Sequence, residues 1–194
     1  MTLEELRERV QHYQQGQHQI EENRALWTTE IKHRIVTSLN AFIAHFNLNC
    51  KVQEVNTYKN YEAVNLTFGN SRSGIVKEKE NETKYFNKFG GALSFSQSCN
   101  GHIDVIILPP FIEEITDKTE KIILVQVQPS EIDEPFIYRQ ISKFLYELMK
   151  WESSPQIPTL GYKFPEKRVT SPSEKALKVV IETAAATTKN EPVK

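Results

Sequence analysis

The chain has 194 residues, a length that fits one ordinary domain with terminal extensions. Its 24 basic and 25 acidic side chains nearly cancel, so the molecule carries no excess charge that would attract a polyanion such as DNA. Two cysteines are too few for a disulfide-stabilised fold, and neither a leader peptide nor an apolar run of membrane-spanning length is recognisable. The composition therefore predicts a soluble, cytoplasmic protein with reduced thiols.

The N-terminal segment predicts a helical arm with a weak coiled-coil seam. Thr2 followed by Glu5 matches a capping box, so a helix is expected to begin there. Polar Gln17 and Arg24 interrupt the seam at positions that a strong coiled coil would make apolar. The apolar residues of the seam recur in a seven-residue pattern and are Leu3, Leu6, Val10, Tyr13, Ile20 and Trp27.

The following residues predict a helix that docks on a core. From Ile31 to Phe46 the apolar residues become denser at helical spacing, which is typical of a core-facing helix side. Gly16 is a candidate break, because glycine inside a helix costs about 1 kcal/mol relative to alanine. Two helices or one bent helix both fit this pattern.

Two hairpins and a further strand are expected next. Residues 51–68 alternate in the manner of a β-hairpin that turns at Lys59-Asn60. Strands 92–99 and 102–108 form the clearest hairpin, because Asn100-Gly101 suits a two-residue type I′ turn. A further apolar strand follows over 121–128.

Residues 69–91 are polar and highly charged, and we expect a short helix near Glu80 to Lys88 rather than a mobile loop. A second long helix is predicted over 135–151, from an apolar face at helical spacing. A last helix over 172–186 is suggested by the capping box Ser171-Pro172-Ser173-Glu174.

These elements together predict an α+β fold. About five antiparallel strands form its sheet, as the hairpin 51–68 followed by the meander 92–128, with helices packed on one face. The expected parts are a helical arm over 1–30, a core domain over 31–152, and a proline-containing connector with a C-terminal helix and tail over 153–194.

One cluster invites a catalytic interpretation. If Asn100-Gly101 is a two-residue turn, Cys99 faces His102, Gln97 faces Asp104, and all four side chains leave the same side of the hairpin. A thiol, an imidazole and a carboxylate are the groups of nucleophilic catalysis. However, Asp104 lies two residues along the strand from His102, and an exposed hairpin tip offers no oxyanion pocket. A polar hairpin tip is therefore the favoured interpretation, with a Cys/His-dependent hydrolase or transferase as the alternative.

The residues for a metal site, a nuclease site or a nucleic-acid-binding surface are each incomplete. His102, Asp104 and Cys99 supply too few ligands for a structural metal site. Asp104 also fits the first strand of a magnesium-dependent nuclease, but Gln126 stands where a second carboxylate is needed, so only a catalytically inactive nuclease-like domain fits. Glutamates interleave with the lysines that form a candidate basic strip, Lys77, Lys79, Lys84 and Lys88. We therefore expect no cofactor, no metal and no nucleic-acid partner.

The remaining indication of function is the apolar seam of the N-terminal helical arm. A helix with apolar residues on one narrow seam must bury them against its own domain, a second copy or another protein. The sequence thus favours a non-enzymatic interaction or regulatory module that binds a protein partner or forms a homo-oligomer, with a small-ligand sensor as a further alternative. The residues expected to carry the interaction are Leu6, Val10, Tyr13, Ile20 and Trp27.

Overall fold

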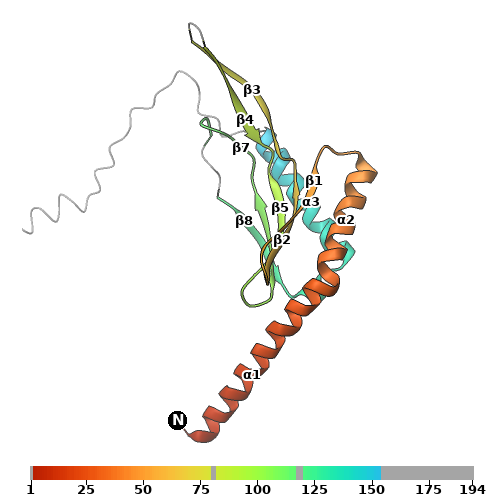
Figure 1. Ribbon diagram of the computed structural model, residues 1–194, viewed down its shortest axis with the longest axis vertical. Coiled ribbons are helices and arrows are strands. Elements are labelled where there is room, and N and C mark those ends of the chain that lie inside the picture. The colour runs from red at the N-terminus through yellow and green to blue at the C-terminus, as the bar shows by residue number, and fades with distance from the viewer. Residues whose placement is uncertain (1, 80–81, 117–119, 154–194) are drawn as a thin grey trace, which may run out of the picture. The chain divides into compact units, whose positions relative to one another are not determined.

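The computed structural model describes residues 2–79, 82–116 and 120–153, which form an α+β fold (Figure 1). The predicted fold class is confirmed, including the five-stranded antiparallel sheet. The predicted helix 172–186 lies outside the described residues. The helical elements are α1 (Leu3–Leu26), the π-helical turn η1 (Trp27–Ile31), α2 (Lys32–Phe46), the 3-10 turn η2 (Pro129–Glu131) and α3 (Glu134–Ser153).

The strands form two sheets. In the larger sheet every neighbouring pair is antiparallel and the order is β1-β2-β5-β6-β8. Its strands are β1 (Lys51–Tyr58), β2 (Tyr61–Thr67), β5 (Ala92–Gln97), β6 (Ile103–Leu108) and β8 (Ile122–Val127). The smaller sheet has the order β3-β4-β7 and consists of β3 (Asn70–Lys79), β4 (Glu82–Phe89) and β7 (Phe111–Ile112).

The core lies between the larger sheet and the helices. Alternate residues of the central strands point to this side, as the period of a β-strand requires, and they meet the apolar faces of α2 and α3. The opposite sheet face carries small or polar residues across one row of paired positions, from Ala63 through Ser96 and Asp104 to Gln126. Fully buried core side chains include Leu66, Leu93, Phe95, Ile103, Ile107, Ile137 and Phe144.

The N-terminal helix runs through Gly16 without a break, and its irregularity lies at Trp27–Ile31 instead. There the Thr28 and Thr29 hydroxyls donate to the carbonyls of Arg24 and Ala25, an arrangement that bends or widens helices. Four buried residues follow at a spacing of four, Trp27, Ile31, Ile35 and Leu39. Residues spaced by four do not stay on one line of an ordinary α-helix, which has 3.6 residues per turn. The wider π turn brings these four residues back onto one side of the helix.

The helix predicted near Glu80 to Lys88 is wrong, because Glu82–Phe89 forms strand β4 and pairs antiparallel with β3. Lysine and glutamate are good helix formers, but Thr83, Tyr85 and Phe86 favour strands, and cross-strand pairing decides between the two. Val76 lies opposite Tyr85, and the Ser73 hydroxyl donates to the Phe86 carbonyl at 2.7 Å.

The two-residue turn predicted at Asn100-Gly101 is also wrong. Gln97 pairs with Ile103 and Ser96 pairs with Asp104, so residues 98–102 connect the strands. Of the predicted turn pair, Gly101 has a positive φ, 78°, whereas the type I′ turn needs two. The Asn100 side chain accepts a hydrogen bond from the His102 amide at 3.1 Å, which stabilises the longer loop.

Candidate functional site

The predicted Cys99–His102–Asp104 group is separated by the register of β5 and β6. Asp104 accepts hydrogen bonds from the Ser98 hydroxyl at 2.5 Å and from the Gln126 amide at 2.6 Å. His102 Nδ1 lies 3.0 Å from the Asn100 amide nitrogen. Cys99 is exposed. The sequence prediction that set Cys99 against His102 and Gln97 against Asp104 is therefore corrected.

The residues around Asp104 are a polar network on the sheet face that lies opposite the core. Ser98 is hydrogen-bonded directly to the carboxylate of Asp104, without the imidazole base that activates serine for acyl transfer. Within the described parts of the chain, no three histidine, cysteine or acidic side chains are grouped to hold a metal ion. The network is thus explained by mutual hydrogen bonding between Ser98, Asp104 and Gln126.

The hairpin tip packs against α1, whereas the sequence predicted an exposed tip. Gly101 is buried, and a Cβ atom added to it would lie 3.0 Å from the carbonyl oxygen of Ile20 and 3.0 Å from Cβ of Asn23. Arg24 donates from Nη2 to the Cys99 carbonyl at 2.9 Å. The tip therefore holds the helix where the arm leaves the domain, and Arg24, predicted as a polar seam position, makes this contact.

The predicted interaction residues divide into two groups. Trp27 is fully buried and belongs to the protein's own core, while Ile20 lies against the hairpin tip. The other members of the stripe are exposed: Leu3 by 86%, Leu6 by 39%, Val10 by 53% and Tyr13 by 66%. Figure 1 shows α1 running away from the sheet toward the N-terminus.

A polar cluster fixes the start of α2 to the sheet. Lys32 Nζ lies 2.9 Å from Glu62, 3.2 Å from Glu54 and 2.8 Å from the side-chain oxygen of Asn56, and Trp27 Nε1 donates to Glu62 at 3.3 Å. Burial by itself would lower the pKa of Lys32, but hydrogen bonds and charge from Glu62 and Glu54 outweigh it and raise that pKa. No sequence motif indicated this cluster.

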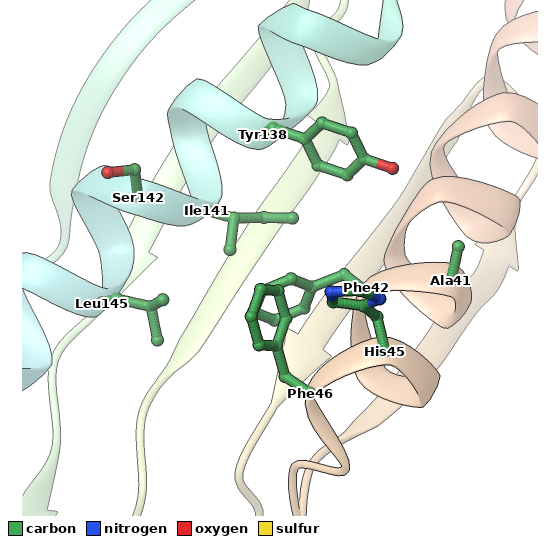
Figure 2. Close-up of a pocket in the computed structure, with 8 residues that line it drawn as sticks. All are labelled: Ala41, Phe42, His45, Phe46, Tyr138, Ile141, Ser142 and Leu145. Atoms are coloured by element: carbon green, nitrogen blue, oxygen red, sulfur yellow. The ribbon is translucent and has the colours of Figure 1, made fainter.

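A groove of about 580 Å³ lies between α2 and α3. Figure 2 shows aromatic side chains of α2 facing α3 across it. The centroids of the Phe42 and Phe46 rings are 5.3 Å apart, and the rings of His45 and Phe46 lie nearly perpendicular with their centroids 4.6 Å apart. The sequence predicted a core-facing role for this helix side, yet Phe46 is 59% exposed. The lining residues are Ala41, Phe42, His45, Phe46, Tyr138, Ile141, Ser142 and Leu145.

Comparison with known proteins assigns no family. No family model matches the sequence, and neither a curated protein nor a solved structure matches the chain. In the part of the chain that the structure describes, no helix is long and apolar enough to cross a membrane.

Proposed function

We propose that the protein is a non-enzymatic interaction module that self-associates through α1. The observation that carries this proposal is that the apolar seam of α1 is covered by the domain at its C-terminal end and exposed at its N-terminal end. Its last member, Trp27, is buried in the domain and Ile20 lies against the hairpin tip, while Leu6, Val10 and Tyr13 are exposed to solvent. A narrow apolar stripe of this kind is typical of a coiled-coil seam, and a second apolar helix would cover its exposed part.

The energetics of the arm also favour a partner. Residues 2–19 are all exposed, so no packing within the domain stabilises this part of the helix. Helices of about 12–15 residues are marginal in water on their own, and Gly16 weakens this one further. The capping box of Thr2 and Glu5 supplies two hydrogen bonds at the helix start but no apolar contact.

A second copy in parallel orientation fits the stripe best. Leu3 and Val10 take the first core position of the heptad and Leu6 and Tyr13 the second, so a parallel pair places identical residues together. An antiparallel pair over the same residues would bring Arg7 near the second Arg7, and Arg9 near the second Arg9. Opposed like charges of this kind disfavour the antiparallel pairing.

The seam is short, and the dimer should accordingly be weak. Arg24 is engaged with the Cys99 carbonyl and Ile20 with the hairpin tip, which leaves the seam from Leu3 to Gln17 for a partner. Stable coiled coils usually extend over at least about three heptads, so we expect reversible dimers with a dissociation constant of micromolar order.

Sedimentation of the full chain over a range of concentrations tests the proposal. Truncation at Thr29 would delete the buried Trp27, so substitutions are the better perturbation. In the double variant Leu6→Glu/Val10→Glu, two charges enter the seam and the dimer should be lost. The matched control, Gln11→Glu/Gln15→Glu, adds the same charge outside the seam and should still dimerise.

Two results would contradict the proposal. One is a monomeric wild-type chain at every concentration. The other is equal association of the seam variant and the control variant. Far-UV circular dichroism should accompany both measurements, because the unpaired arm is also expected to lose helix when the dimer dissociates.

A further inference from the structure

A second surface for self-association lies at the edge of the larger sheet. β8 is the last strand of the order β1-β2-β5-β6-β8, and in the described part of the chain it pairs with β6 alone. Alternate backbone N–H and C=O groups of such a strand point away from the sheet and are available to another strand.

The two edges of the sheet differ in chemistry. β1, with the sequence KVQEVNTY, carries Lys51 and Glu54, and such charges are a common protection against edge pairing. β8 reads IILVQV and contains five apolar residues, no charge and no proline. The register shift beside Leu124 interrupts β8 once, while Val125–Val127 keeps regular pairing with β6.

The apolar residues of β8 are incompletely covered. The core-facing residues of β5 and β6 are fully buried, whereas Val125 and Val127 on β8 are half-buried. On the opposite sheet face Ile123 is 61% exposed and pairs with Ile106. Leu108, two residues farther along β6 on the same face, is 40% exposed. Both faces of this edge therefore present apolar surface that a neighbouring strand would cover.

We infer that β8 pairs antiparallel with β8 of a second copy, joining two five-stranded sheets across a two-fold axis. The edge is self-complementary, because a two-fold axis sets the same backbone pattern and the same apolar residues against each other. No charged side chain of β8 enters this pairing, whereas a β1 pair would bring Lys51 and Glu54 of both copies to the joined edge. The same axis brings the two Ile123–Ile106 patches onto one continuous face.

This edge interface is separate from the arm. One strand pair buries less than the roughly 1,600 Å² of a standard protein interface, so its association should also be concentration-dependent. It is best measured in the Leu6→Glu/Val10→Glu background, in which the arm no longer contributes. Failure of the arm proposal and failure of the edge proposal are then seen in different variants.

The test substitution is Ile123→Lys, which places a charge at an exposed edge position. Its matched control is Gln53→Lys, which lies in the same row of paired residues at the other edge of the sheet. In the arm-variant background we expect residual dimers near millimolar concentration. Ile123→Lys should raise their dissociation constant at least about tenfold, or about 1.4 kcal/mol, and Gln53→Lys should leave it unchanged.

Hydrogen exchange provides the second measurement. Amides of β8 should gain protection as the concentration rises, while those of β1 should not. A strictly monomeric arm variant with rapidly exchanging β8 amides would overturn the inference and leave the edge to an extended segment of another protein. Equal dissociation constants for Ile123→Lys and Gln53→Lys would overturn it as well.

Discussion

The contact between the hairpin tip and α1 predicts a specific cost for Gly101→Ala. Gly101 has a φ of 78°, and its missing Cβ would approach the Ile20 carbonyl oxygen to 3.0 Å. The obstacle is helix backbone, which cannot rotate aside as a side chain would. Either the tip or the helix must therefore move when a methyl group is added.

The magnitude follows from two contributions. An L-residue in the left-handed region costs about 1–2 kcal/mol. Inserting a methyl group into a close-packed contact adds about 1–3 kcal/mol. Gly74→Ala separates the two, because Gly74 has nearly the same φ, 80°, but nothing lies within 4 Å of the added Cβ. We expect a loss of about 1–2 kcal/mol for Gly74→Ala and of about 2–4 kcal/mol for Gly101→Ala.

Urea denaturation of both variants, followed by circular dichroism at a concentration low enough to keep the chain monomeric, gives the two free energies of unfolding. The difference between them measures the steric part alone. Equal losses in the two variants would refute the argument, since they would mean that the tip does not press on the helix. A loss in Gly74→Ala larger than that in Gly101→Ala would have the same meaning.

Two further predictions concern titratable groups. Lys32→Met should cost about 1.5–3 kcal/mol at neutral pH, because Glu62 loses a charged donor in a largely covered site. The pKa of Lys32 is raised in the folded state, so its contribution to the free energy of unfolding is complete below the ordinary pKa of 10.5 and is lost as pH rises through the higher folded value. The free energies of unfolding of wild type and variant should therefore converge at high pH. Burial raises the pKa of the Cys50 thiol, and Cys99 is exposed, so iodoacetamide should modify Cys99 faster than Cys50 in single-cysteine variants at about pH 8. A Cys99 rate far above that of free glutathione would instead favour the hydrolase or transferase alternative.

The fold was accessible from sequence where periodicity and turn chemistry agreed. The capping box of Thr2 and Glu5, the turn at Lys59-Asn60 and the apolar face of α3 each specify local structure through several residues at once. The β3–β4 pair was missed because its exposed lysines and glutamates favour a helix, while its structure is decided by contacts between the two strands, such as Val76 with Tyr85, that helix propensity does not reflect.

The predicted arrangement of Cys99, His102 and Asp104 was wrong for a more local reason. Asn-Gly is a strong signal for a two-residue turn, yet the Asn100 side chain bonds to the His102 amide and a longer loop results. A change in turn length alters which residues pair, so Asp104 pairs with Ser96 instead of Gln97. The partners of Lys32 could not be predicted from sequence for a related reason. Glu54 and Glu62 come within reach of Lys32 only when β1, β2 and α2 are assembled.

The exposed stripe follows from the lengths of the elements. The continuous helical segment from Leu3 to Phe46 has 44 residues, and at about 1.5 Å per residue it is about 66 Å long. The longest strand of the larger sheet, β1, has 8 residues and spans about 27 Å. A helix packed along such a sheet must extend beyond it by more than half of its length. The exposed part of the heptad stripe, with Leu6, Val10 and Tyr13, lies on this overhang, so the domain's own sheet is too short to cover it; the proposed second copy would supply the missing apolar surface.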